Sequence, residues 1–306
     1  MSTVSQSMHT PYDGSSKPFT IGLKPLERGD FIDADANLFA YLDEKDRLAA
    51  DVGDQVMVAE AGSEPAQQEV LDLIVTHICT AHPQTFCRVG QQVEIMGARR
   101  SIDLTDPAIP PIHRAARLVQ EDLVLMRKGD TGWYLSAASV CFPSAWNLHE
   151  KFLRPMHEIH GPVPGFGEGT RNAAMIERMF DNLKPGVPVI RWNWSLYGDD
   201  RLFHPATDKG MTRRFGDGAE PANINLRLER QTLQKLPATG AMLFTIRIYI
   251  DPIEAMEKHP EAARLAQSVI EQLQAMSDEE VDYKGLKHER ERLVNRLKKA
   301  AGLPPH

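Results

Sequence analysis

Alternation of hydrophobic and polar positions is clearest in the second half of the chain. Residues 224–233 (INLRLERQTL) and 241–250 (AMLFTIRIYI) alternate with a period of two, which predicts strands with one apolar and one polar face. The preceding segment 187–196 (VPVIRWNWSL) completes a run of three predicted strands. Further upstream, residues 122–128 and 133–142 flank the turn-like GDTG and predict a β-hairpin.

Helical spacing of apolar residues separates this hairpin from the three strands. Residues 146–159 and 168–183 predict two helices, divided by GPVPGFG, whose prolines and glycines do not continue a helix. A hairpin, inserted helices and three further strands is the element order of a PAS domain. The sequence therefore predicts an α+β fold, with a PAS-like antiparallel five-stranded sheet with inserted helices, plus N-terminal and C-terminal helical extensions.

The segments outside this core predict further helices and one small hairpin. Loose alternation at 89–104 predicts the hairpin. The additional helices are predicted at 38–51, 63–82, 115–120, 255–276 and 286–300. The predicted organisation is a disordered tail at 1–18, an N-terminal extension packed on the core at 19–119, the PAS-like core at 120–252 and C-terminal helices at 253–306.

Composition narrows the class of protein. The 306 residues are 42% hydrophobic and 25% charged, which is typical of a globular chain. A formal net charge of -7 argues against nucleic acid as a partner, because phosphate binding requires clustered Lys and Arg. We expect no membrane span, because no run of about 18 apolar residues is present. Three irregularly spaced cysteines and the lack of a secretion signal favour a reducing location, the cytoplasm.

Two histidines stand near the end of the predicted helix 146–159. His157 and His160 are three residues apart and precede Gly161 and Pro162. A histidine fixed by a helix end and a following proline is suited to be the axial ligand of haem iron, which requires one immovable imidazole. The same spacing is also typical of a surface pair or of half of a non-haem metal site, although no third ligand stands at a matching position.

Charged residues alternate with apolar ones on the last two predicted strands. This alternation allows Glu229 and Arg247 to lie on a common surface of neighbouring strands. The pair is typical of a cross-strand salt bridge on a solvated face. It is also compatible with a cavity whose few polar groups orient a ligand.

The strand at 187–196 is rich in groups that contact a bulky, flat cofactor. Arg191, Asn193, Trp194 and Ser195 offer a cation, an amide, an aromatic ring and a hydroxyl. The alternative is that the tryptophan is a core residue and Arg191 lies at the surface.

Cys141 closes the apolar strand 133–142 and has two interpretations. It is most simply a small buried residue, but a thiolate ligand would suit oxygenase chemistry. Motifs for other enzyme classes are missing from the sequence: there is no G-x-S-x-G, no P-loop, no H-E-x-x-H, and no dinucleotide G-x-G-x-x-G after a strand.

Several longer segments resemble one family, the alpha subunit of haem-dependent oxidative N-demethylase. They are QEDLVLM (120–126), AASVCFPSAW (137–146), IHGPVPG (159–165), RWNWSL (191–196), LRLERQTLQKLPATGAMLFTIRIYIDP (226–252) and YKG (283–285). The resemblance implies haem b as the cofactor and a small methylated amine, such as dimethylamine, oxidised with dioxygen (O2). It implies two partners: an NADPH-dependent flavin and iron-sulfur reductase subunit, and a tetrahydrofolate-binding subunit that captures formaldehyde.

The resemblance also implies roles for individual residues. His160 is the expected iron ligand, with His157 as the fallback, because haem-binding PAS sensors use a histidine in the helical segment before the last three strands. Glu229 would pair with the cationic amine, because a buried ammonium needs an anionic partner. Arg247 would hydrogen-bond to oxygen or to a propionate. Two alternatives remain: a haem-PAS gas or redox sensor, and a non-catalytic ligand-binding member of the family.

Overall fold

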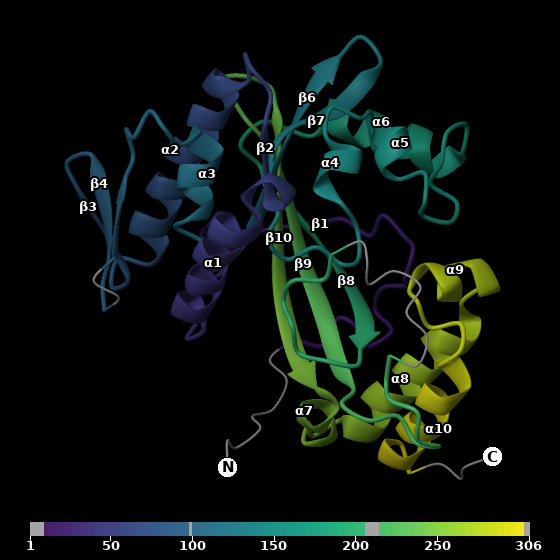
Figure 1. The fold of residues 1–306 in the computed structure, drawn as a ribbon. Helices are drawn as coiled ribbons and strands as arrows, with labels where there is room; N and C mark the ends of the chain where they lie inside the picture. Colours follow the sequence, from purple (N-terminus) through teal and green to yellow (C-terminus); the bar gives the residue numbers. More distant parts are fainter. Residues whose placement is uncertain (1–8, 98–99, 206–213, 303–306) are drawn as a thin grey trace.

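In a computed structural model that describes residues 9–97, 100–205 and 214–302, seven antiparallel strands form a central sheet in the order β1-β8-β9-β10-β6-β7-β2 (Figure 1). Its strands are β1 (Lys24–Pro25), β2 (Met57–Ala59), β6 (Asp122–Gly129), β7 (Gly132–Ser139), β8 (Val189–Tyr197), β9 (Asn225–Lys235) and β10 (Met242–Pro252). In the same ranges, a three-stranded sheet contains β3 (Phe86–Val89), β4 (Gln92–Ile95) and β5 (Arg100–Asp103).

The strands predicted for the core are present. β6 and β7 form the predicted hairpin, and β8, β9 and β10 follow as antiparallel neighbours. β10 also pairs with β6, so these five strands are contiguous. The described sheet is wider than the five strands predicted, because β1 pairs with β8 and β2 pairs with β7 at the two edges. The predicted hairpin at 89–104 is confirmed as β4 and β5, which pair antiparallel, and β3, which begins at Phe86, adds a third strand beside β4.

Helices surround the central sheet. Those before β8 are η1 (Arg28–Asp30), α1 (Leu38–Val56), α2 (Glu64–Ala81), α3 (Pro111–Ala116), α4 (Leu148–Lys151), α5 (Met156–Ile159) and α6 (Arg171–Asn182). Those after β10 are α7 (Ile253–Glu257), α8 (Ala262–Ala275), α9 (Asp278–Tyr283) and α10 (Arg290–Ala300). Among the described helices, none combines the length and the apolar character that a membrane crossing requires.

The predicted helix at 146–159 is wrong as a single element. It divides into α4 and α5 around Leu153, which has a left-handed φ of 60° and whose amide donates to the carbonyl of Leu135 at 2.9 Å. Pro155 then caps α5 and has no amide hydrogen with which to continue α4. Because of this interruption, α5 and the loop that follows it pack against the sheet separately from α4.

Other predicted helices differ in their bounds. α3 lies earlier than the predicted 115–120, because Pro111 supplies the fixed φ of a first helical turn. The predicted helix at 255–276 divides into α7 and α8. α9 occupies a segment for which the apolar pattern predicts no helix.

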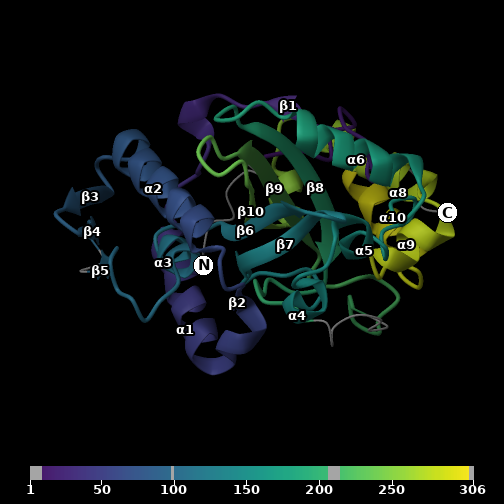
Figure 2. The same ribbon diagram turned by 90° about the horizontal axis from the view of Figure 1, so that it is seen from above.

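The two faces of the central sheet carry different apolar clusters. The first face presents Leu125 and Leu243 toward α2 and α3, and at β8 and β9 it presents Trp194 toward the helices that follow β10. The second face presents Val124 and Leu233 toward α5 and α6. Both ribbon views show α1 to α3 at one end of the molecule and α8 to α10 at the other end (Figures 1 and 2).

The N-terminal segment is anchored to the helices after β10. Tyr12 is 0% exposed, and its carbonyl accepts hydrogen bonds from Ser268 Oγ at 2.8 Å and Gln272 Nε2 at 2.9 Å. The predicted disordered tail at 1–18 is therefore wrong at Tyr12. Residues 1–8 of that predicted tail lie outside the described residues.

Candidate functional site

Glu229 on β9 is the centre of a hydrogen-bonded cluster on the second face. Its Oε1 accepts from Ser144 Oγ at 2.8 Å, and its Oε2 accepts from Asn193 Nδ2 at 3.2 Å and Gln231 Nε2 at 2.8 Å. Asn193 is the cross-strand neighbour of Glu229 on β8, and Gln231 lies two residues farther along β9. Strand geometry therefore brings two neutral donors to Oε2, and the loop that carries Ser144 brings a third to Oε1.

Arg227 supplies positive charge to this cluster. It is 1% exposed, its Nε donates to Ser144 Oγ at 3.1 Å, and its Nη2 donates to Phe142 O at 2.8 Å. Burial alone would raise the pKa of Glu229, but Arg227 and the hydrogen bonds from Ser144 and Asn193 outweigh burial and lower this pKa. Glu229 is therefore an anion at neutral pH.

Strained backbone fixes the loop that carries Ser144. The next residue, Ala145, has a left-handed φ of 58°, which costs about 1–2 kcal/mol for a residue with a Cβ. Its amide donates to the carbonyl of His204 at 3.0 Å, and Ser144 forms an isolated β-bridge with the same residue. These contacts hold Ser144 within hydrogen-bond distance of Glu229.

His160 and Arg191 lie beside the cluster and have enclosed nitrogens. Among the described residues, His160 Nδ1 and Arg191 Nε are shielded from solvent and have no hydrogen-bond partner. Burial, with smaller contributions from the charges of Lys151 and Arg191, lowers the pKa of His160 to about 4. Burial also lowers the pKa of Arg191, against the opposing influence of Glu229. His160 is therefore a neutral imidazole at pH 7, and Arg191 is the electrostatic neighbour of both His160 and Glu229.

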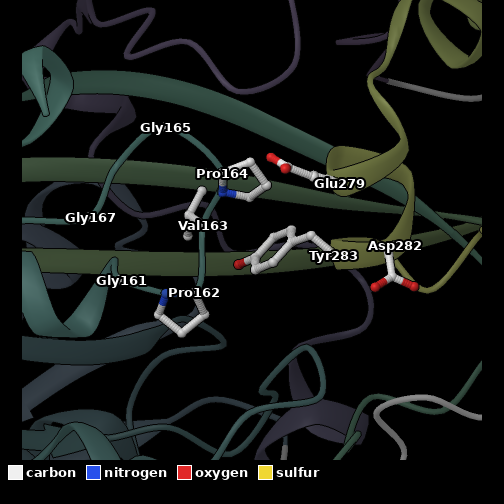
Figure 3. Close-up of a pocket in the computed structure, with 9 residues that line it drawn as sticks. All are labelled: Gly161, Pro162, Val163, Pro164, Gly165, Gly167, Glu279, Asp282 and Tyr283. Atoms are coloured by element: carbon white, nitrogen blue, oxygen red, sulfur yellow. The ribbon is translucent and has the colours of Figure 1, made fainter.

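A cavity of about 400 Å³ opens between the loop that follows His160 and helix α9 (Figure 3). It is lined by Gly161, Pro162, Val163, Pro164, Gly165, Gly167, Glu279, Asp282 and Tyr283. Tyr283 extends from α9 toward the loop across the opening (Figure 3). Although Tyr283 is 42% exposed, partial desolvation of its hydroxyl group and the negative charge of Glu229 raise its pKa. The volume is typical of sites for small ligands. One lining residue, Tyr283, is an electrostatic neighbour of Glu229 and so connects the cavity with the Glu229 cluster.

The site contains one histidine with an enclosed, unpaired nitrogen. Within the described ranges, no group of three or more His, Cys, Asp and Glu side chains is arranged to hold a metal ion. Haem iron needs only one protein ligand, because the porphyrin itself supplies four nitrogen ligands. A neutral His160 is chemically suited to that single position.

Arg247 lies on the opposite side of the sheet from Glu229. The β9–β10 register pairs Arg247 with Arg230 and Ile248 with Glu229, so the predicted common surface of Glu229 and Arg247 is wrong. Arg247 is 0% exposed, and its Nη2 donates to Asp35 Oδ2 at 2.9 Å. It fixes the N-terminal segment on the first face, so its expected contact with oxygen or a propionate has no support in this geometry.

The three cofactor contacts predicted on β8 divide between the two faces. Arg191 and Ser195 lie on the face of Glu229, as the alternation of the strand requires. Trp194 is 3% exposed on the first face, where its Nε1 donates to Gln272 Oε1 at 3.3 Å. Trp194 is therefore a core residue beneath the C-terminal helices, which corrects its interpretation as a cofactor contact.

The two alternative iron ligands lie in different surroundings. His157 is in α5, where it is an electrostatic neighbour of Glu177. Cys141 is 2% exposed in a cluster with Phe142, and burial, together with the negative charge of Asp122, raises its pKa to about 12. Its thiol stays protonated at neutral pH, which favours the interpretation of Cys141 as a small buried residue.

Four residues of this site were not predicted from the sequence: Arg227, Gln231 and Ser144 in the cluster, and Lys284, whose Nζ donates to Asn193 Oδ1 at 3.5 Å. Arg227 was detectable, because the alternation of β9 places it on the same face as Glu229. Ser144 and Lys284 carried no local signal, since a loop and the C-terminal chain bring them to the strands. Long-range packing of this kind has no periodic pattern in the sequence.

The fold and this face define an α+β protein with a buried, charged cluster beside an open cavity. A family model, described as haem-dependent oxidative N-demethylase, alpha subunit-like, matches residues 22–294. The chain belongs to this family.

Proposed function

We propose that this chain is the haem-binding alpha subunit of an oxidative N-demethylase that acts on a small secondary amine such as dimethylamine. The family assignment supports the reaction class. The observation that carries the proposal is that His160, Arg191 and Glu229 are electrostatic neighbours at one face of the sheet. They provide a neutral imidazole, a cation and an anion in one place.

The residues present fit a haem group. His160 would be the axial ligand, because its Nδ1 is enclosed and unpaired and the ring is neutral at pH 7. Arg191 would pair with a propionate, since its Nε is also unpaired, and Ser195 would lie on the same face as a further polar contact. Bound haem b would supply the redox chemistry with dioxygen.

Glu229 would bind the protonated amine. Its carboxylate is ionised and its orientation is fixed by Ser144, Asn193 and Gln231, so an ammonium group can be held with defined geometry. Arg227 competes for the same negative charge, so the amine must approach the side of the carboxylate away from the guanidinium. This arrangement favours a small amine over a bulky one.

The family description of an alpha subunit supports an assembly with other subunits. We propose that electrons come from a separate NADPH-dependent flavin and iron-sulfur reductase, and that a tetrahydrofolate-binding subunit takes up the formaldehyde. We also propose that the core is PAS-like. The order hairpin, α4 to α6, then β8 to β10, with β10 beside β6, supports this likeness.

Visible absorption spectra test the proposal. The full-length protein, reconstituted with haem, should show a Soret band that shifts on reduction with dithionite and again on titration with dimethylamine. His160→Ala should abolish stoichiometric haem binding or change the ligation, whereas His157→Ala should leave the spectrum unchanged. A missing Soret band in the wild type would refute the cofactor. A Soret band insensitive to amines would refute the amine substrate and favour a sensor.

A further inference from the structure

The segment Tyr283-Lys284-Gly285 forms a rigid turn at the end of α9. The amide of Gly285 donates to Asp282 O at 2.9 Å and the amide of Leu286 donates to Val281 O at 2.9 Å, which is the hydrogen-bond pattern of a Schellman motif. Gly285 has the left-handed φ of 67° that this motif requires. The turn therefore fixes the backbone of Lys284, the residue between α9 and the glycine.

Arg214 holds this turn against the sheet. Its Nη1 donates to Lys284 O at 3.1 Å, and its guanidinium lies 4.5 Å from the ring centre of Tyr197 on β8. A Cβ at position 285 would stand 2.5 Å from Arg214 Nη1, so only glycine fits there without displacing the arginine. The C-terminal helices are thus tied to β8 at Lys284.

The side chain of Lys284 points into the sheet edge. Lys284 is 9% exposed, and its Nζ donates to Trp194 O at 2.6 Å and to Asn193 Oδ1 at 3.5 Å. The carbonyl of Trp194 can accept it because β1 pairs with β8 only at Val189 and Ile190. The buried ammonium group of Lys284 therefore contacts Asn193, which itself donates a hydrogen bond to Glu229.

The Asn193 amide connects Lys284 to Glu229. Its Oδ1 accepts from Lys284, and its Nδ2 donates to Glu229 Oε2 at 3.2 Å. A side-chain amide has one acceptor end and one donor end, so the cation selects which end faces the carboxylate. The reversed amide would point its oxygen at Glu229 and its NH₂ group at the ammonium, and both contacts would be repulsive.

We propose that Lys284 is a positioning residue of the site: it holds the Asn193 amide so that Glu229 receives a hydrogen bond and keeps the geometry that accepts a protonated amine. The amine part rests on the proposed function, whereas the ordering of Glu229 does not. The C-terminal helices then form a wall of the site rather than an output module. Lys284 also lowers the pKa of Glu229, after the larger effects of burial, Arg227, Ser144 and Asn193.

The test follows the carboxyl carbon of Glu229 by ¹³C NMR during a pH titration of the full-length protein without haem or amine, with Glu229→Gln for assignment. Lys284→Met should raise the pKa of Glu229. The matched control Lys287→Met, an exposed lysine in the next turn, should leave it unchanged. Lys284→Arg, which retains the cation, should restore most of the wild-type titration.

A double-mutant cycle separates positioning from a simple charge effect. Asn193→Ala should also raise the pKa of Glu229, and in that background Lys284→Met should have a much smaller effect than in the wild type. An equal effect in both backgrounds, or no effect of either substitution, would overturn the proposal. If Lys284→Met does not fold, Lys284→Gln takes its place in the cycle.

Amine binding provides the functional readout. In the haem-loaded protein, Lys284→Met should weaken the binding of dimethylamine about tenfold, the equivalent of one hydrogen bond to a charged group, with unchanged haem content. If Glu229→Gln leaves amine binding intact, the proposed function fails. The NMR result would still decide whether Lys284 orders Glu229.

Discussion

Replacing Arg227 with methionine tests how far the protein depends on its buried charge cluster. The guanidinium donates to Ser144 Oγ and to the carbonyl oxygens of Phe142, Pro143, Arg201 and Leu202. Removing it leaves these acceptors and the Glu229 carboxylate without their cation. Arg227 and Glu229 meet through Ser144 rather than in direct contact, and each buried partner left unsatisfied costs about 1–3 kcal/mol, so we expect the free energy of unfolding to fall by about 4 kcal/mol.

The charge component is separable by a cycle with Glu229→Gln. In that background no anion remains to be stranded, so Arg227→Met should cost about 1–2 kcal/mol less than in the wild type. Urea denaturation at pH 7, followed by far-ultraviolet circular dichroism, measures all four proteins. The exposed Arg171→Met should change stability by less than about 0.5 kcal/mol. A cost below about 1 kcal/mol for Arg227→Met, or equal costs in both backgrounds, would refute this reasoning.

Three further predictions concern pH, the opposite face and the backbone. The pKa of His160 is about 4 in the folded protein, compared with an ordinary value of 6.5. Because the unfolded chain is protonated first, the free energy of unfolding should decrease as the pH falls from 6.5 to 4. His160→Gln should flatten that decrease in urea titrations. Arg247→Met should destabilise the fold by about 2–3 kcal/mol through loss of the Asp35 contact, yet leave the affinity for dimethylamine unchanged; weakened amine binding would return Arg247 to the site. Gly198→Ala should lower the melting temperature and reduce soluble protein, because its Cβ would stand 1.7 Å from Arg214 O; an unchanged melting temperature would contradict the close approach.

The periodic part of the fold was predictable from the sequence. The alternation of β9 and β10 predicts both strands and, within each strand, which residues share a face. The relative register of the two strands was not predictable, because it depends on the path of the connecting loop between Lys235 and Met242. A shift of one residue would place Arg247 opposite Glu229. The separation of these two residues is therefore a property of the loop rather than of either strand.

The site was predictable only where its residues belong to strands or to a recognisable segment. Glu229 and Arg191 were selected from strand patterns, and His160 from a helix end followed by a proline. Ser144 depends on the left-handed backbone at Ala145, for which the sequence shows no glycine. Lys284 depends on the docking of α9 at the free edge of β8, a contact over 90 residues of chain.

The burial of Tyr12 extends the folded unit beyond the residues that the family model matches. The family match spans residues 22–294, but Tyr12 and Leu297 lie outside it and are both 0% exposed in the cluster beneath the C-terminal helices. A fragment trimmed to the family limits would lose both side chains and open the apolar layer that supports Trp194. Such a fragment should aggregate during expression, so the choice of cloning limits, and not only the choice of mutations, decides whether the site can be studied in isolation.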